Sequence, residues 1–210
     1  MMLMQAYRSI KGRARRAIIG EPVLWDRVIL EKETRKIIDA LPASKMDALE
    51  ISGDNGKAYP FKSFKSANFP EYDICKEPID LEAFDIVLAE QVFEHLLYPY
   101  RAARNVYAML RPRGYFFIST PFLQKVHNFP VDCSRWTALG MKYFLVEAGF
   151  PPETIQTGSW GNRSVIQATF KTPYFPYYNR FVHSLKNEET FPIQVWALAR
   201  KAPISTLNQS

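Results

Sequence analysis

The feature that most constrains the fold is the apolar run Phe84–Ala89, which ends abruptly at Glu90 and Gln91. Its residues do not alternate between apolar and polar, which is typical of a strand buried on both faces of a parallel sheet. Open parallel sheets bind ligands at the carboxyl ends of their strands, so we expect Glu90 and Gln91 at the rim of a site. Residues 91–97 are predicted to form a short helix from which His95 faces that site.

Length and composition are those of one globular domain spanning residues 1–210, with 47% apolar and 23% charged residues. A net charge of +6 favours anionic partners without selecting one. Two cysteines, Cys75 and Cys133, make no disulfide framework and suit a reducing, cytoplasmic compartment. No apolar run reaches the roughly 18 residues of a membrane span, and the amino-terminal segment does not resemble a secretory signal.

Strand-like and helix-like segments alternate along the chain. The predicted strands are 48–51, 64–69, 84–89, 115–120, 154–170 and 191–200, and the predicted helices are 22–41, 91–97, 99–110 and 137–148. This order predicts an α/β fold of three layers, with a doubly wound and mostly parallel sheet. The last two strands lack a long helix between them, so we expect an antiparallel hairpin at the sheet edge. Residues 111–114 are predicted to be a turn.

Two segments at the ends of the chain allow two interpretations each. Residues 1–20 carry five basic side chains and no acid. They form either a solvated basic helix or a flap that closes on an anionic substrate or makes weak contact with an acidic membrane surface. The aromatic segment 174–181 forms a lid together with that amino-terminal segment, or it is an apolar edge covered by its own loop.

Four blocks between residues 47 and 150 carry a family resemblance. They are the loop Leu49–Gly56, the strand and turn Phe84–His95, the turn Met109–Tyr115 and the helix end Glu147–Phe150. In this order and spacing they resemble the class I S-adenosylmethionine-dependent methyltransferases of the small bacterial type. The resemblance implies a Rossmann-like methyltransferase fold with S-adenosylmethionine as cofactor. It also implies a cofactor-binding core over residues 45–150 and carboxyl-terminal edge strands with an aromatic insertion over 151–210.

The chain departs from the family pattern in its cofactor half. Ser52 and Asp54 stand where the first two glycines of the cofactor loop are usual, and Asn68 stands where an acid normally binds the ribose. Asparagine accepts a hydrogen bond there without the strength of a charged acceptor. The short spacers after the first two predicted strands leave room for only a stub of the first helix and for none of the second. We therefore expect a shortened cofactor half.

The resemblance assigns cofactor-binding roles to ten residues. They are Glu50, Ser52, Gly53, Gly56, Asn68, Asp73, Ile74, Glu90, Gln91 and His95. Glu50 would fix the glycine loop or reach the methionine amino group; alternatively it is a buried acid satisfied by loop amides. Asp73 would accept the adenine amino hydrogen, with Ile74 beside the ring. His95 either lies near the cofactor or is a satisfied structural histidine.

The loop after the predicted strand 115–120 holds the candidates for acid–base chemistry. His127 and Asp132 are positioned there to remove a proton from the methyl acceptor, or they only pin the loop. Arg135 and Trp136 would bind an anionic or sugar-like substrate, although Trp136 equally suits the core.

Other chemistries lack their motifs. The three histidines and two cysteines show no close ligand pair, so we expect no metal site. The G-x-S-x-G elbow, the phosphate-binding loop, the G-x-G-x-x-G of dehydrogenases and the recognised nucleic-acid modules do not occur either.

The sequence therefore predicts an enzyme that transfers a methyl group, by in-line displacement, to a small-molecule or glycan-type acceptor. The alternative is a protein of the same fold that has lost catalysis and acts as a binding or scaffolding module, which the altered glycine loop motivates. The acceptor atom and the oligomeric state stay open at this point.

Overall fold

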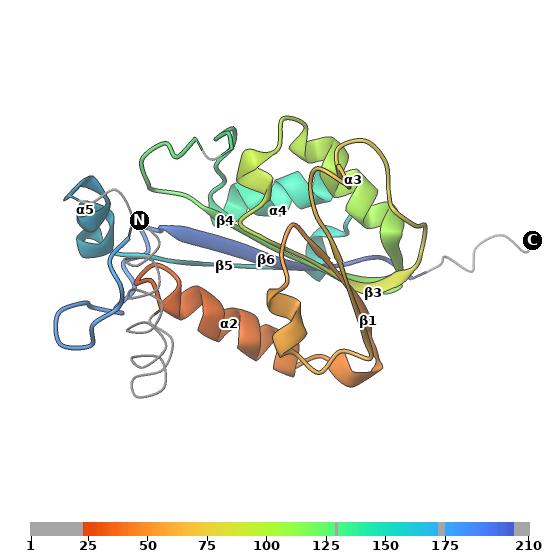
Figure 1. Ribbon diagram of the computed structural model, residues 1–210, viewed down its shortest axis with the longest axis horizontal. Coiled ribbons are helices and arrows are strands. Elements are labelled where there is room, and N and C mark those ends of the chain that lie inside the picture. Colours follow the sequence, from red (N-terminus) through yellow and green to blue (C-terminus); the bar gives the residue numbers. More distant parts are fainter. Residues whose placement is uncertain (1–22, 129, 172–174, 204–210) are drawn as a thin grey trace, which may run out of the picture.

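The computed structural model describes residues 23–128, 130–171 and 175–203. Its strands form one sheet in the order β2-β1-β3-β4-β6-β5 (Figure 1). The strands are β1 (Asp47–Ile51), β2 (Ser63–Ala67), β3 (Phe84–Glu90), β4 (Leu110–Pro121), β5 (Ile155–Trp160) and β6 (Gln194–Arg200). The α-helices are α2 (Val28–Asp39), α3 (Pro99–Met109), α4 (Ala138–Glu147) and α5 (Arg163–Lys171). Short 3-10 turns are η1 (Ala43–Lys45), η2 (Asn55–Ala58), η3 (Phe93–His95) and η4 (Pro152–Thr154).

The sheet is parallel over β2, β1, β3 and β4, and β6 is antiparallel to both of its neighbours, β4 and β5. The predicted mostly parallel α/β sheet with an antiparallel edge is thus confirmed. Parallel strands end at the same edge of a sheet, so the loops after β1, β3 and β4 meet there.

Helices cover both faces of the sheet: α2 and η2 lie on one side, and α3 and α4 on the other (Figure 1). The central strand β3 is buried on both faces, as predicted. Val87 and Ala89 belong to the core shared with α3 and α4, whereas Ile86 and Leu88 belong to the core shared with α2. Alternate residues of a strand point to opposite faces, so a strand in this position needs an uninterrupted apolar run.

The helices follow from their sequences. In α3, Pro99 occupies the first turn, where its missing N–H costs nothing, and Ala102, Val106 and Met109 are buried. In α4, the Thr137 hydroxyl accepts a hydrogen bond from the Gly140 N–H, and Gly149 ends the helix region with a φ of +112°. Both helices were predicted close to their observed bounds.

The helix α2 begins later than predicted, at Val28, and the proposed start at Glu21-Pro22 lies outside the described residues, as do residues 1–20. Leu30, Thr34 and Ile38 form its buried stripe at helical spacing. No helix in the described ranges is both long and apolar enough to cross a bilayer.

Three local predictions are wrong. Residues 91–97 form only the single turn η3, because Gln91 turns the chain with a φ of +56° and Pro99 already starts α3. Residues 111–114 belong to β4 rather than to a free turn, although the pairing with β3 shifts register there and Arg113 has a φ of +67°.

The third error concerns the predicted strand over 154–170. The strand β5 ends at Trp160, and α5 follows at Arg163. The Asn162 side chain accepts a hydrogen bond from the Val165 N–H at 2.9 Å, which is a helix cap. This cap separates strand from helix in a stretch where the apolar pattern alone is ambiguous.

The shortened cofactor half is confirmed. Only η2 lies between β1 and β2, and residues 68–83 contain neither helix nor strand. The loop after β1 is therefore compact and lies directly over the strand ends.

An ion-pair cluster at the opposite ends of the strands predicts a pH effect on stability. Arg111 Nη1 lies 3.0 Å from Asp47 Oδ2 and 2.7 Å from Asp85 Oδ2, and Ser63 Oγ donates to Asp47 Oδ1 at 2.7 Å. The Ser63 hydrogen bond, followed by that of Arg111, lowers the pKa of Asp47 from 3.8 to about 2.

A carboxyl whose pKa is lower in the folded state stabilises it above the unfolded pKa and loses that contribution as pH falls through the folded pKa. We therefore expect the free energy of unfolding to fall between pH 3.8 and about 2. Asp47→Asn should flatten this part of the profile. Urea unfolding across pH measures it, with the exposed Asp39→Asn as control. Equal slopes for Asp47→Asn and the wild type would contradict this account.

Candidate functional site

The loop after β1 wraps around a buried glutamate. Ser52 turns the chain with a φ of +53°, and Glu50 Oε2 accepts a hydrogen bond from the Gly56 N–H at 2.7 Å. A Cβ added to Gly53 would stand 2.2 Å from Glu50 Oε1, and one added to Gly56 would stand 2.3 Å from the Phe64 ring. The carboxylate thus packs under both glycines, which explains why glycine stands at these two positions.

Glu50 is 1% exposed, and burial raises the pKa of its carboxyl, partly offset by the hydrogen bonds from the Gly56 and Asn55 amides. Ser66 Oγ donates to the Gly53 carbonyl, and the Ser52 N–H donates to the Ala67 carbonyl at 2.9 Å. The loop is therefore tied both to its own strand and to β2.

The end of β3 forms the second part of the site. Gln91 Nε2 donates to Gln194 Oε1 at 2.9 Å, and Gln194 Nε2 donates to Asp26 Oδ2 at 2.9 Å. These hydrogen bonds link the turn after β3 to β6 and to Asp26, two residues before α2. They direct the Gln91 side chain toward β6.

A cavity of about 970 Å³ lies between α2, η2 and the end of β3. Its walls come from residues 23–35, from residues 55–59, and from Glu90 and Gln91. This volume is large enough for a small-molecule ligand. Glu90 lines it, and burial, followed by repulsion from Glu50, raises the pKa of Glu90 to about 7.

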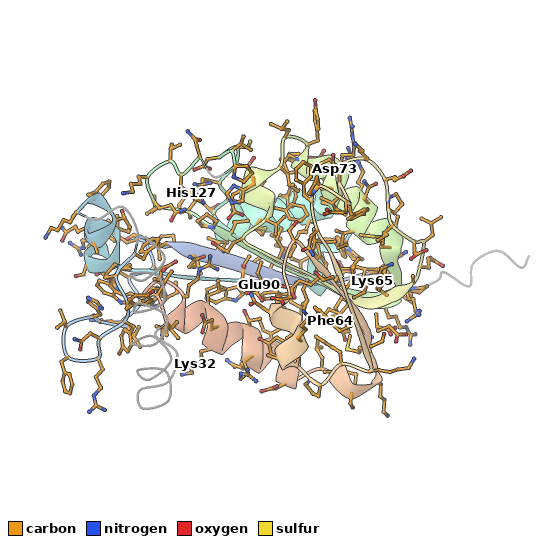
Figure 2. The ribbon with its side chains drawn as sticks, viewed as in Figure 1. Lys32, Phe64, Lys65, Asp73, Glu90 and His127 are labelled. Atoms are coloured by element: carbon orange, nitrogen blue, oxygen red, sulfur yellow. The ribbon has the colours of Figure 1, made fainter. Side chains whose placement is uncertain are left out.

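Of the ten predicted cofactor residues, only Glu90 and Gln91 line this cavity. The others lie outside its lining: Glu50, Ser52, Gly53, Gly56, Asn68, Asp73, Ile74 and His95. Asn68 is exposed in a turn after β2. Asp73 Oδ1 accepts a hydrogen bond from the Cys75 N–H at 2.9 Å, and the buried Ile74 has its carbonyl bound by Asn105 of α3 at 2.7 Å. Asp73 lies on the α3 side of the sheet, whereas Lys32 lies on the α2 side (Figure 2). The adenine and ribose roles of these residues stay predictions.

The two residues predicted for proton transfer come together on the loop after β4. Asp132 Oδ2 accepts a hydrogen bond from the His127 N–H at 2.8 Å and lies 3.1 Å from His127 Nδ1. Arg135 donates to both oxygens of the Asp132 carboxylate, at 2.5 Å from Nη2 to Oδ2. Desolvation lowers the pKa of His127, and the Arg135 hydrogen bond lowers the pKa of Asp132 in spite of its burial.

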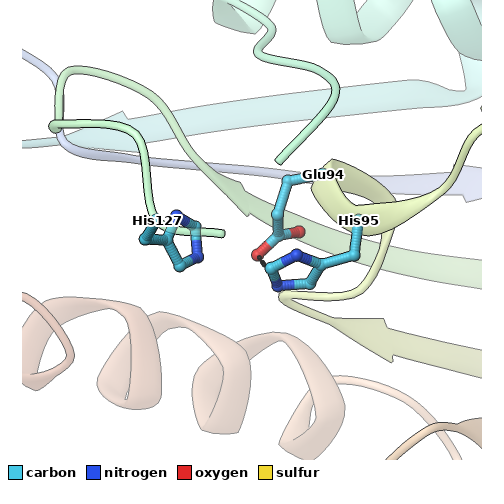
Figure 3. A group of neighbouring side chains, drawn as sticks. All are labelled: Glu94, His95 and His127. Carbon is cyan, nitrogen blue, oxygen red and sulfur yellow. Dashed lines mark ion pairs between the residues drawn. The ribbon is translucent and has the colours of Figure 1, made fainter. Parts of the chain in front are cut away.

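His95 and Glu94 lie beside this pair (Figure 3). The imidazoles of His95 and His127 meet edge to face with ring centroids 5.1 Å apart. His95 Nδ1 lies 2.5 Å from the Val131 carbonyl oxygen, and His95 Nε2 lies 3.6 Å from Glu94 Oε1. Burial raises the pKa of Glu94 to about 7.

Sequence reasoning missed Glu94 and Arg27 as site residues. Glu94 lies within the block Phe84–His95, and its place beside His95 is the available signal. Arg27 lines the cavity and interacts with Glu90 and Glu94 electrostatically, but nothing in its sequence context indicated this. Trp136 is a core residue, 9% exposed, with its ring 4.9 Å from that of Phe144.

The aromatic segment and the chain before α2 are neighbours. The Trp25 N–H donates to the Pro176 carbonyl at 2.9 Å, and the Tyr178 N–H donates to the Val23 carbonyl at 2.8 Å. Val23 and Leu24 also line the cavity. The described part of the aromatic segment thus supports one cavity wall, and its role as a lid stays a prediction.

The residues at this edge fit a nucleoside-type cofactor. The backbone of the glycine loop packs closely over the end of β1, and an open cavity borders the loop. The Glu50 carboxylate lies within the loop, and the Glu90 carboxylate lies beside it. Asn55, Ala58 and Tyr59 would border the cofactor from the loop, Glu50 would support that loop from beneath, and Glu90 would face the cofactor from β3.

Comparison with known proteins gives one domain match. A family model described as a methyltransferase domain matches residues 44–118. No curated protein gave a significant sequence match.

Solved structures share the fold. A methyltransferase from Thermotoga maritima, described as a possible histamine N-methyltransferase, has a TM-score of 0.55 at 13% identity, covering 84% of this chain and 98% of its own. A methyltransferase from Archaeoglobus fulgidus has a TM-score of 0.55 at 13% identity, with coverages of 89% and 97%. The phosphoethanolamine N-methyltransferase 2 of Haemonchus contortus, in complex with S-adenosylmethionine, has a TM-score of 0.55 at 9% identity, with coverages of 82% and 52%. The domain match over residues 44–118 and the shared fold show that the chain is similar to S-adenosylmethionine-dependent methyltransferases in this part of its sequence and in its architecture.

Proposed function

We propose that this methyltransferase acts on a small, polar acceptor of the metabolite or glycan type, and that His127, oriented by Asp132, removes the acceptor proton. The observation that carries the proposal is the 3.1 Å contact between His127 Nδ1 and Asp132 Oδ2 on the loop after β4. This loop leaves the same edge of the sheet as the cofactor loop after β1.

S-adenosylmethionine supplies an activated methyl group, so the protein has only to position the acceptor and to manage its proton. Asp132 orients the imidazole through Nδ1, which leaves Nε2 as the nitrogen that accepts a proton. Arg135 neutralises Asp132, because it bonds both carboxylate oxygens. A histidine that is neutral near pH 7 is suited to act as a general base.

The cavity, which the cofactor would share with the acceptor, has polar walls that favour a polar acceptor, and His127 lies on the loop after β4 outside its lining. Five charged side chains line it: Arg27, Glu31, Lys32, Arg35 and Glu90. An apolar substrate would desolvate these charges without pairing them, whereas hydroxyl or amino groups would hydrogen-bond to them. Both signs of charge are present, which suits a neutral molecule with several hydroxyl groups.

The experiment that tests this function is a transfer assay with methyl-labelled S-adenosylmethionine and a panel of acceptors. The panel comprises free sugars, nucleotide sugars, small amines, fatty acids and apolar phenols. Label should move to the sugar-type or amine-type acceptors in the panel. Transfer to the apolar members alone would contradict the proposed acceptor class.

One prediction concerns the adenine end of the cofactor. If Asp73 accepts the adenine amino hydrogen, Asp73→Ala weakens cofactor binding by about 1–3 kcal/mol, the cost of leaving a buried donor unpaired. Calorimetric titration with S-adenosylmethionine measures it. Asp73→Asn is the matched control, because its amide oxygen still accepts from the Cys75 N–H that Asp73 Oδ1 now binds. Equal affinities for Asp73→Ala and the wild type would mean that the adenine binds elsewhere.

A further inference from the structure

Three side chains with metal-binding atoms meet in front of the ends of β3 and β4. Figure 3 shows Glu94 and His95 on η3 facing His127 on the loop after β4, and their ligand atoms all lie within 4.8 Å of one another. Glu94 and His95 are adjacent in sequence, but His127 lies 33 residues after Glu94, so no short ligand motif indicated the cluster.

The spacing is close to that of a metal site. Zinc binds imidazole nitrogen and carboxylate oxygen at about 2.0–2.2 Å, so two ligand atoms of a tetrahedral ion lie roughly 3.4 Å apart. His95 Nε2 and Glu94 Oε1 lie 3.6 Å apart, which already matches. His127 completes the set from a loop, with its side chain 38% exposed, so a small shift of this residue suffices.

Both histidines present the correct nitrogen. The Val131 carbonyl can only accept a hydrogen bond, so His95 Nδ1, at 2.5 Å from it, carries the proton and Nε2 carries the lone pair. His127 Nδ1 is in contact with Asp132 Oδ2 at 3.1 Å, Gln124 Nε2 at 3.2 Å and Arg135 Nη2 at 3.3 Å. Asp132 Oδ2 is the only hydrogen-bond acceptor among these three atoms and it is charged, so we assign the Nδ1–H of His127 to the carboxylate and treat the Gln124 and Arg135 nitrogens as neighbours of Nδ1.

Ligating histidines usually donate their other ring N–H to a carboxylate or a backbone carbonyl, which fixes the tautomer and the ring orientation. His95 has the carbonyl partner and His127 the carboxylate partner. This arrangement leaves two nitrogen lone pairs directed to the same space beside Glu94 (Figure 3).

Glu94 provides an independent indication. Its side chain is 1% exposed, and among the described residues its Oε2 has no hydrogen-bond partner. A buried carboxylate oxygen without a partner is costly, and such groups are normally paired or bound to a metal. A cation held at Glu94 Oε1 between the two imidazoles would compensate the charge of this buried carboxylate, and a rotation of the carboxylate would bring Oε2 to the same ion.

We propose that Glu94, His95 and His127 bind one divalent transition-metal ion, with Asp132 positioning His127 as an outer partner. Two imidazoles and one carboxylate favour zinc, iron, cobalt or manganese over magnesium and calcium, which prefer oxygen-only sites. Three protein ligands leave at least one coordination position open for water or another ligand.

The proposed metal site and the proposed methyl transfer both use the Nε2 atom of His127. His127 Nε2 cannot both bind an ion and accept a proton, so loading the ion is expected to slow methyl transfer wherever His127 acts as the base. The metal site itself does not rest on that function, because binding is measured without cofactor or acceptor.

The test is a titration of chelator-treated, tag-free protein with Co²⁺, followed by its visible absorption bands and by calorimetry with Zn²⁺. We expect one ion per chain and affinity losses of at least about tenfold in Glu94→Gln and in His127→Asn. The control is His183→Asn, because His183 stacks on Trp25 at a centroid distance of 4.1 Å and lies outside the cluster. Its affinity should equal that of the wild type. Cys133→Ser should also keep full affinity, which excludes the nearby free thiol.

Two results would overturn the metal site. One is a wild-type protein that binds Co²⁺ and Zn²⁺ no more tightly than Glu94→Gln and His127→Asn do. The other is an affinity that falls only in His183→Asn or Cys133→Ser. Circular dichroism of each variant shows that it is folded, and His127→Gln supplies a second ligand variant if His127→Asn unfolds. Either result leaves the transfer assay, and with it the proposed function, unaffected.

Discussion

His127→Asn is expected to slow methyl transfer by about 10²–10⁴-fold, the usual contribution of a general base. Asparagine cannot accept the proton that imidazole Nε2 accepts, so the rate falls. The affinity for S-adenosylmethionine should stay unchanged, because His127 lies on the loop after β4 and not on the cofactor loop. The measurement is kcat with the best acceptor of the panel, in chelator-treated protein so that metal binding does not contribute.

A loop-pinning role for His127 makes a different prediction. Its backbone N–H donates to Asp132 whichever side chain is present, so asparagine preserves that contact. His183→Asn, at a histidine outside the site, is the control and should leave kcat unchanged. A His127→Asn enzyme with wild-type kcat would show that the histidine only supports the loop. A pH–rate profile gives a further readout, because a base at this position produces an acid-side limb that the variant lacks.

The second large effect is expected at Glu50. Glu50→Ala removes the acceptor of the Gly56 N–H, bound at 2.7 Å, and leaves that buried donor without a partner. Such a loss costs about 1–3 kcal/mol of folding free energy. The cofactor loop then loses its fixed shape, so we expect an affinity for S-adenosylmethionine at least about tenfold lower, which is 1.4 kcal/mol.

Glu50→Gln distinguishes the role of the hydrogen bond to Gly56, which shapes the loop, from the role of the carboxylate charge. The glutamine oxygen still accepts from the Gly56 N–H, and because burial raises the pKa of Glu50, a neutral group is tolerated there. We expect this variant to retain most of the stability and most of the cofactor affinity. Urea unfolding and calorimetry measure the two quantities. If Glu50→Ala keeps both at wild-type values, the carboxylate does not shape the loop.

The sheet was predictable because its strands carry their own signals. Ile86, Val87, Leu88 and Ala89 form an uninterrupted apolar run, and only a strand covered on both faces requires one. Thr137 and Gly149 mark the start and the end of α4 through local hydrogen bonding and a positive φ. These features depend on the nearest neighbours in sequence, which is why sequence reasoning found them.

Long-range contacts decided the parts that were missed. The turn η3 is short because Gln91 bends the chain and bonds back to the end of β4, where its N–H donates to the Ser119 carbonyl at 2.9 Å. The helix α5 needs the Asn162 cap, whose side chain also bonds the distant carbonyls of Ser184 and Lys186. Neither arrangement leaves a periodic pattern in the sequence.

In the site, too, features within one loop were predictable and contacts between loops were not. His127 and Asp132 lie five residues apart on one loop and were predicted as a pair from their position after a strand; their role in proton transfer stays a prediction. The approach of Glu94 and His95 to His127 joins two loops, so the cluster became visible only with the fold. Arg27, the residue immediately before α2, lines the cavity. It falls within the amphipathic helix predicted from the sequence over residues 22–41.

The central claim is that the loop after β1, the end of β3 and the loop after β4 enclose one S-adenosylmethionine site with the acceptor beside His127. A crystal structure of the protein grown with S-adenosylmethionine tests it most directly. We predict one cofactor per chain, in contact with the Gly53–Gly56 loop and facing Glu90, with its sulfonium end toward the loop that carries His127. Cofactor density at another surface, or none at this edge at saturating concentration, would contradict the account.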